Sequence, residues 1–586
     1  MRQAGERLRV VLLGIVAAGC AAGPAADETA DLVLRNGRVV TVDSAVPEAQ
    51  AVAVQGHRIL AVGSDAEIEE YIGGDTEVID LNGRLAIPGF IEGHGHFAGV
   101  GEKLLNLDLM NVRNWDEVVA MVGAAARDAQ QDAWIVGRGW HQEKWDEIPE
   151  PSVDGVPVHA SLDSVSPDNP VYLTHASGHA AFVNGRALEL AGITRETPNP
   201  AGGEIVKDAA GEPTGLLRET AQRLAGRVRA RAESERPPAD VAAERRRVLE
   251  LAAQEALSKG VTSFHDAGTG FGTIDVLKEL EAEGALPVRL YVMIRESTEQ
   301  LEQHLADYRM VADTNDYLVV RAIKVSIDGA LGSHGAWLLE PYEDMPTSTG
   351  LATVEPESVA RTAELAMANG FQLAVHAIGD RANREVLDIY ERVFAEHPEA
   401  RDPRWRIEHA QHLHPDDIRR FGELGVIPAM QGVHATSDAP WIPRRLGEQR
   451  AREGAYVWQE LMKSGAVIAN GTDAPVEDIN PIASFYSSVS RRTNTGDVFY
   501  AEQRMSREEA LRSYTLNNAY AAFEEDVKGS LTPGKLADIV VLSKDIMRVP
   551  EEEIPTAEVD VTIVGGEVRY RRATAATAAA DLVPMK

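Results

Sequence analysis

Six side chains that can bind a metal ion are spread through the chain, and most of them close a short, strand-like apolar run. Two are histidines separated by one residue, in the segment LAIPGFIEGHGHF. On an extended backbone, residues i and i+2 point to the same face, so His94 and His96 can share one cation. The other four stand singly near the ends of further apolar runs: Lys324, His376, His409 and Asp473. Together they predict a metal site.

Asp473 and Lys324 would have special roles in such a site. Asp473, in VIANGTDAP, can both bind a metal and accept a proton from its bound water, although an aspartate there can also cap a helix. Lys324, in VVRAIKVSIDGALGS, would be costly to bury as a free ammonium. A nearby metal pair favours the neutral amine, which can add carbon dioxide and become a carbamate that bridges two metals. The alternative is a lysine paired with Asp328.

The elements that carry these residues repeat in the order helix, glycine, strand. Four predicted helices are each followed by a glycine suited to a helix C-terminal cap and then by an apolar run suited to a buried parallel strand: 241–259, 357–369, 416–424 and 457–463. With no Gly-rich phosphate loop in the chain, these units favour an α/β fold of the (β/α)8 TIM type. The reactive residues fall at strand C-termini, the rim where barrel active sites form.

Both ends of the chain predict β-structure. Period-two patterns surround Asn36-Gly37 and Asn82-Gly83, where we expect hairpin turns, and a further turn at Gly565-Gly566. A small β-sandwich domain built from both termini accounts for these strands with few exposed edges. The expected division is a β-sandwich from 31–88 and 535–571, a barrel from 89–534 with an insertion over its mouth at about 105–240, and a disordered tail at 572–586.

The net charge and the N-terminal sequence indicate which partners and which location to expect. The formal net charge of -33 repels phosphate backbones, which makes nucleic acid an unsuitable partner. Arginines precede a short apolar run, and the order VAAGC leads to Cys20, the sole cysteine of the chain. We expect residues 1–19 to be a signal peptide, lipidated Cys20 to anchor an exported bacterial cell-envelope lipoprotein, and residues 20–30 to be its tether. An ordinary cleaved signal is the alternative.

Several motifs together resemble the YtcJ-like branch, family 3, of the amidohydrolase superfamily, from about residue 30 to residue 570. They are PGFIEGHGHF, GVTSFHDAG, IKVSIDGALGS, LAVHAIGD, RIEHAQ, AMQGVHATSD, GTDAPV and GSLTPGKLADIVVL. The resemblance implies that His94 and His96 bind a first metal with Asp473, that His376 and His409 bind a second, and that carboxylated Lys324 bridges both. Relatives commonly carry Asp-Ser in place of Glu92-Gly93, and Arg in place of His334.

The expected activity is that of a metal-dependent amidohydrolase with two divalent ions, zinc by expectation. A metal-bound hydroxide would attack an amide or related C–N bond of a small molecule, and Asp473 would carry the proton to the leaving nitrogen. Trp140, His179 and His434 are the predicted substrate contacts. Two alternatives stay open, a single-metal deaminase and a non-catalytic lipoprotein that binds a ligand. The sequence does not determine the substrate or the oligomeric state.

Overall fold

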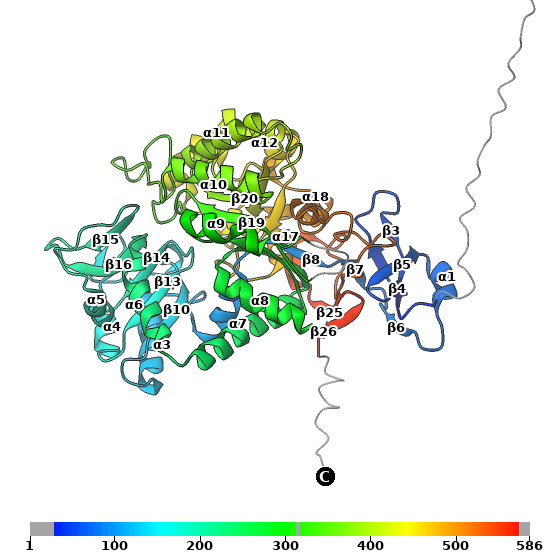
Figure 1. The fold of residues 1–586 in the computed structure, drawn as a ribbon, viewed down its shortest axis with the longest axis horizontal. Coiled ribbons are helices and arrows are strands. Elements are labelled where there is room, and N and C mark those ends of the chain that lie inside the picture. Colours follow the sequence, from blue (N-terminus) through cyan, green and yellow to red (C-terminus); the bar gives the residue numbers. More distant parts are fainter. Residues whose placement is uncertain (1–28, 312–316, 574–586) are drawn as a thin grey trace, which may run out of the picture.

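A computed structural model describes residues 29–311 and 317–573, and its centre is a barrel of eight parallel strands (Figure 1). In the order in which they neighbour one another, the strands are β23 (Ala469–Gly471), β22 (Ile427–Gln431), β21 (Arg406–His409), β20 (Gln372–Ala377), β19 (Leu318–Ser326), β18 (Arg289–Ile294), β17 (Val261–Thr269) and β8 (Phe90–Gly95). The predicted (β/α)8 barrel is confirmed.

The seam of the barrel lies between β23 and β8, where two backbone hydrogen bonds and one carboxylate join the strands and the residues that follow them; one of the bonds runs from the His96 amide to the Ala474 carbonyl oxygen at 2.7 Å. The Asp473 amide donates to the carbonyl oxygen of His94 at 2.7 Å. Glu92, buried on β8, accepts hydrogen bonds from Thr472, at 2.6 Å from its amide and 3.1 Å from its hydroxyl. This joint holds the first and last strands together and so fixes the distance between His94 and Asp473.

Helices cover the outside of the barrel, and the glycines that follow them reverse the chain into the next strand. At Gly370 and Gly425 the backbone is left-handed, with φ of +66° at both, a conformation that glycine adopts without steric cost. The helices of this unit are α2 (Phe97–Leu105), α7 (Pro238–Ser258), α8 (Phe271–Ala282), α9 (Thr298–His304), α10 (Pro356–Asn369), α11 (Asp380–Glu396), α12 (Pro415–Leu424), α13 (Gly432–Asp438), α14 (Ile442–Leu446), α15 (Glu448–Gly454), α16 (Trp458–Lys463), α17 (Pro481–Ser490), α18 (Arg507–Ser513) and α19 (Leu516–Ala521). The four helices predicted from the sequence are among them, within three residues at each end.

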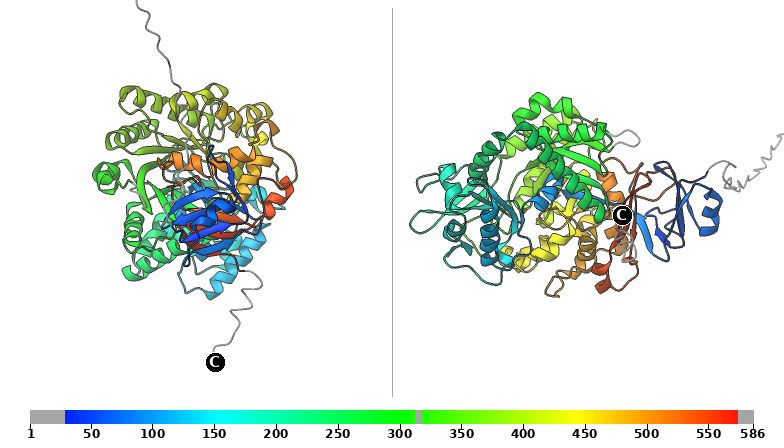
Figure 2. Two further views of the ribbon diagram at one scale, coloured as in Figure 1. Left: turned by 90° about the vertical axis from the view of Figure 1, so that its right-hand side faces the viewer. Right: turned by 90° about the horizontal axis from the view of Figure 1, so that it is seen from below.

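The segment between α2 and α7 forms a lobe of its own, a six-stranded mixed sheet with helices packed on it. The strands run in the order β15 (Gly203–Lys207), β16 (Pro213–Glu219), β14 (Ala180–Val183), β13 (Val171–His175), β10 (Ile135–Trp140) and β9 (Leu107–Asp108). Its helices are α3 (Trp115–Asp128), α4 (Ala160–Val165), α5 (Gly185–Ala191) and α6 (Gln222–Ser234). The lobe and the N-terminal strands lie on opposite sides of the barrel (Figures 1 and 2).

Strands from both ends of the chain share a two-sheet unit. One sheet has the order β5 (Arg58–Gly63), β4 (Ala51–Gln55), β1 (Leu32–Arg35), β6 (Glu77–Asp80). The other has the order β26 (Glu567–Arg571), β25 (Val559–Val564), β24 (Ile539–Leu542), β7 (Leu85–Pro88), β2 (Arg38–Val40), β3 (Glu48–Ala49). The Gly565-Gly566 turn is a hairpin, because β25 and β26 pair in antiparallel fashion across it.

The other two predicted hairpins are wrong. β1 and β2 flank Asn36-Gly37 but belong to different sheets, and so do β6 and β7 around Asn82-Gly83. Asn36 and Asn82 do adopt the positive φ expected of a sharp turn, 60° and 49°. Each turn nevertheless carries the chain across the sandwich, because Leu34 on β1 and Val39 on β2 are buried in one core between the two sheets. The free energy gained by burying both flanking strands in this core outweighs that of pairing them as a local hairpin.

Candidate metal centre

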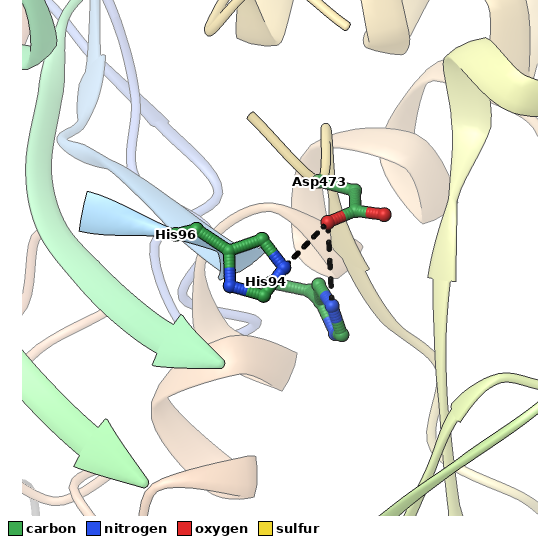
Figure 3. Close-up of side chains that lie close together, drawn as sticks. All are labelled: His94, His96 and Asp473. Atoms are coloured by element: carbon green, nitrogen blue, oxygen red, sulfur yellow. Dashed lines mark ion pairs between the residues drawn. The ribbon is translucent and has the colours of Figure 1, made fainter. Parts of the chain in front are cut away.

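His94, His96 and Asp473 meet at the rim of the barrel (Figure 3). His94 is the next-to-last residue of β8 and His96 is the N-cap of α2. Asp473 follows β23 with a left-handed backbone, φ 57°, that turns its side chain towards the histidines. Asp473 Oδ1 lies 3.5 Å from His94 Nε2 and 3.2 Å from His96 Nε2. The three residues can hold one metal ion, since one donor atom from each lies within 4.8 Å of the others.

The protonation of His94 indicates that a cation belongs between it and Asp473. His94 Nδ1 forms a short contact with the Glu408 carboxylate, so Nδ1 carries the proton and donates it. Nε2 then presents a lone pair to Asp473 Oδ1, and neither atom has a hydrogen-bond partner among the described residues. Two buried acceptors facing each other are unfavourable alone, and a metal ion satisfies both.

The charges of these groups agree with that arrangement. Burial lowers the pKa of His94 to about 4, so the ring is neutral near pH 7. Although burial acts in the opposite direction, the neighbouring histidines hold the pKa of Asp473 well below its usual value. A neutral imidazole and an ionised carboxylate are the forms that bind divalent metals.

His409 and His376 lie next to this group. The ring of His409 is centred 4.6 Å from that of His94 and 4.5 Å from that of His376. His409 Nδ1 donates to Gln431 Oε1 at 2.8 Å, which leaves Nε2 with a free lone pair for a metal. The backbone of His409 has φ of 75°, which breaks the alternation of β21 and lets its ring reach the rim.

His376 lies beside a buried carboxylate, although its Nε2 has no hydrogen-bond partner among the described residues. Its Nε2 lies 3.4 Å from Asp328 Oδ1. Asp328 itself accepts backbone hydrogen bonds from Trp337, Ile378 and Gly379, at 2.9, 3.0 and 2.8 Å. These donors fix Asp328, and the buried Nε2 of His376, which has no partner in the described chain, is available to a metal.

Lys324, on β19, is the remaining predicted ligand, and it is only 3% exposed. Within residues 29–311 and 317–573 it forms no ion pair, so the pairing with Asp328 that the sequence left open does not occur. Burial lowers its pKa to about 8. It lines the same cavity as His96, His376 and Asp473. The amine therefore stands beside the candidate ligands without a direct ion pair in the described chain, and the Glu408 and Asp473 carboxylates only partly offset the effect of burial on its pKa.

Two of the three predicted substrate contacts also reach this place. His179 Nδ1 lies 2.8 Å from Glu219 Oε2, and although burial lowers the pKa of His179, the Glu219 carboxylate raises it above its usual value. Gln411 Nε2 donates to His434 Nδ1 at 3.2 Å, which leaves the Nε2 of His434 as an N–H donor. A His434 nitrogen also lies within 4.8 Å of donor atoms of His409 and Asp473.

The structure does not bring Trp140 to the metal centre. Its side chain is 1% exposed, packs in the hydrophobic core of the insertion lobe and donates its indole N–H to the Leu173 carbonyl at 2.9 Å. His334 also lies away from the centre, with Nε2 3.1 Å from Asp344 Oδ1. The predicted lipidation site, Cys20, lies outside the described residues.

Sequence reasoning missed a buried ion pair beneath the metal centre. Arg406 and Glu408 on β21 are both fully buried, with Nε 2.6 Å from Oε1 and a second contact of 3.0 Å. Burial alone would raise the pKa of Glu408, but Arg406 and His94 lower it below its usual range. The motif RIEH contained the signal, since a charged pair at i and i+2 in a buried strand must face one interior.

Two cavities share several of the candidate ligands. The larger has a volume of about 990 Å³ and lies between the barrel rim and the insertion lobe. The smaller, of about 60 Å³, includes His434 and Trp441 in its walls. His179, His376, His409 and Asp473 border both cavities. A bound molecule can thus place one substituent on each side of the metal centre.

The chain is similar in sequence and in fold to known proteins. A model of the amidohydrolase family matches residues 77–570. The putative amidohydrolase YtcJ of Bacillus subtilis is 33% identical over 533 residues, covering 89% of this chain and 96% of that protein. N-substituted formamide deformylase of Arthrobacter pascens is 29% identical over 548 residues, covering 92% and 98%. An uncharacterized metal-dependent hydrolase of Pyrococcus horikoshii has a similar solved structure, with a TM-score of 0.70, 26% identity and coverage of 89% and 99%.

Proposed function

The chain belongs to the amidohydrolase family and is a metal-dependent hydrolase, and we propose that it cleaves an amide or related carbon–nitrogen bond at a centre of two divalent metals. The observation that carries the proposal is the pair of facing acceptors, His94 Nε2 and Asp473 Oδ1, at 3.5 Å in a buried site. Further ligand-type groups converge around this pair. The similarity to N-substituted formamide deformylase supports the choice of a carbon–nitrogen bond.

The residues suit two metal positions. His94, His96 and Asp473 would hold the first metal, and His376 and His409 the second. The candidate ligands are mostly imidazole nitrogens with few carboxylates, and the sequence has no cysteine after residue 20. Such a ligand set is suited to zinc.

Lys324 would join the two positions as a carbamate. Its neutral amine nitrogen bonds to the carbon of carbon dioxide and loses one proton, which gives an anion with two oxygens. Burial, the pKa lowered to about 8 and the lack of an ion pair within the described chain all favour this reaction. The carbamate and Asp473 supply two negative charges against the four positive charges of two divalent ions, which leaves the centre electrophilic.

The chain's own groups divide the remaining work. Bound divalent metals lower the pKa of water to about 7 and polarise a carbonyl oxygen. Asp473 accepts the proton of the attacking water and passes it to the leaving nitrogen, because its carboxylate faces the cavity beside both metal positions. His179, held by Glu219, and His434, held by Gln411, present N–H donors from two sides and orient the substrate.

The proposal is tested with zinc-loaded protein and a panel of formamides, N-acyl amino acids and cyclic amides. We expect hydrolysis of at least one class, with activity lost in Asp473→Asn and after metal chelation. Full metal occupancy with saturable binding but no turnover of any compound would instead indicate a protein that captures a ligand.

A single-metal deaminase remains the second candidate, because His94, His96 and Asp473 already form a complete group without Lys324. Such an enzyme would keep its metal when Lys324 is removed. A two-metal enzyme bridged by Lys324 would lose at least one of its two metals.

For location, we propose an exported lipoprotein anchored through Cys20 in the bacterial cell envelope, on the residue order VAAGC after a short apolar run. Within the described ranges, the chain has no helix with the length and apolar character needed to span a bilayer. The Cys20→Ser variant should leave the membrane fraction, and its retention there would contradict lipid anchoring at Cys20.

A further inference from the structure

Four arginines line the larger cavity: Arg138, Arg223, Arg227 and Arg295. Arg138 comes from β10 of the insertion lobe, two from α6, and Arg295 directly follows β18 of the barrel. The cavity therefore receives positive charge from both the lobe and the barrel. This contrasts with the whole chain, whose formal net charge is -33.

None of these four arginines forms an ion pair within residues 29–311 and 317–573. Arg138 donates only to the carbonyl oxygen of Ala176, at 3.1 Å, and Arg295 only to the hydroxyl of Ser326, at 3.2 Å. Each guanidinium has five N–H donors, so most of them remain available to a ligand. The Nε of Arg138 is buried with no partner in the described structure.

The carboxylates in the same walls are already engaged by other donors. Glu219 accepts from His179, and Glu296 accepts from the Phe271 amide at 2.9 Å. Asp328 is held by its three backbone amides, and Glu299 by its own amide and Ser297. These four acids form no ion pair with the arginines. Asp473, the remaining carboxylate of the cavity wall, acts on Arg138 and Arg295 without a direct ion pair, so a bound anion could still pair with the guanidiniums.

Two of the arginines reach the candidate metal centre. The stem of Arg295 and the stem of Lys324 both lie against Gly268, 2.9 and 3.2 Å from the point where a Cβ of that glycine would stand. The Arg138 guanidinium lies against Gly178 in the same way, at 3.5 Å. Gly178 precedes His179. Arg138 therefore lies beside the segment that carries His179, and Arg295 lies beside Lys324. Arg223 lies close enough to Arg295 to be repelled by it.

We propose that Arg138, Arg223 and Arg295 bind a carboxylate of the substrate, so that the hydrolase acts on anionic amides such as N-acyl amino acids. This inference rests on the proposed hydrolysis at the metal centre and names its substrate class. The carboxylate lies in the larger cavity while the scissile bond lies between the metal ligands. A cavity that already holds two adjacent guanidiniums gains most from a ligand of opposite charge.

The test uses two probes of nearly the same shape, N-formylphenylalanine, which carries a carboxylate, and N-formylphenylalanine amide, which carries a neutral carboxamide. Their dissociation constants are measured by calorimetry on the full-length Asp473→Asn protein, which does not consume them. We expect the carboxylate to bind about tenfold more tightly or better, as a charge-assisted hydrogen bond provides. The ratio of the two dissociation constants should fall close to one in Arg295→Gln and in Arg138→Gln. Part of the preference for the carboxylate should persist in Arg295→Lys.

Arg127→Gln is the matched control, because Arg127 is an exposed residue of α3 in the same lobe. It should keep the full preference, and thermal unfolding of each variant verifies its fold. Equal binding of both probes, binding of neither, or a preference that survives both cavity substitutions would overturn the inference.

Turnover by the zinc-loaded wild type separates this inference from the proposed function. Hydrolysis of neutral amides with no preference for a carboxylate would support the proposed hydrolase activity and contradict the proposed arginine site. The opposite result is a clear preference for the carboxylate in binding, lost in Arg295→Gln, without hydrolysis of any amide. That result would support the arginine site and contradict the proposed activity.

Discussion

Replacing Glu408 with glutamine tests whether the buried Arg406–Glu408 pair serves the metal centre as well as the barrel core. The substitution leaves the fully buried guanidinium without its counter-charge, which costs about 3–5 kcal/mol of unfolding free energy. With an unfolding entropy of about 2.1 cal/mol/K per residue over the roughly 450 residues of the barrel, this lowers Tm by about 3–5 °C. His94 also loses the carboxylate that orients it, so zinc affinity should fall about 10–100-fold.

Two measurements on the same protein separate these effects. Calorimetry of metal-free protein gives the change in Tm, and competition with a chromophoric chelator gives the zinc affinity. The matched control is Asp538→Asn, which breaks the buried Arg289–Asp538 pair, with Nε and Oδ2 3.0 Å apart, outside the metal centre. We expect it to lower Tm without changing zinc affinity.

The reasoning is refuted if Glu408→Gln lowers Tm but binds zinc as tightly as the wild type. An equal loss of zinc affinity in Asp538→Asn would also refute it, because the effect would then be a general consequence of destabilisation.

Two further predictions concern the barrel seam and acid stability. Gly93→Ala should abolish stable folding, since a Cβ there would stand 2.4 Å from the Asn470 carbonyl oxygen and 2.5 Å from Asn518 Oδ1; soluble protein with wild-type Tm would contradict this. The pKa of Asp344 is lowered, because Arg445 outweighs the opposing effect of burial. A depressed folded pKa contributes stability above the unfolded value of about 3.9 that is lost as pH falls through the folded value. The Tm of Asp344→Asn should therefore change less than that of the wild type on acidification, and parallel curves would exclude the ion pair.

The positions of the ligand-type residues could be read from the sequence because parallel strands bring their C-terminal ends to one rim. His94 and His376 are each the next-to-last residue of a strand and His409 is the last of another, so the rim position follows from chain order and apolar runs alone. The helix–glycine–strand repeats were predictable for the same local reason.

Features that depend on how distant segments pack could not be read in this way. The motif RIEH indicates that Arg406 and Glu408 face one interior, but the contact of Glu408 with His94 Nδ1 arises only when the barrel closes. The Asn36-Gly37 turn has hairpin residues but crosses between sheets, because the burial of both flanking strands is a long-range effect. Trp140 resembled a binding residue by its loop-like surroundings, whereas the insertion lobe uses it to fill its own core.

The most direct test of the two-metal centre is the zinc content per chain of the wild type and of Lys324→Ala, each purified with zinc and bicarbonate. The account predicts about two ions per chain in the wild type, and about one or fewer in Lys324→Ala together with loss of hydrolysis. Unchanged zinc content and unchanged activity in Lys324→Ala would contradict a centre bridged by this lysine.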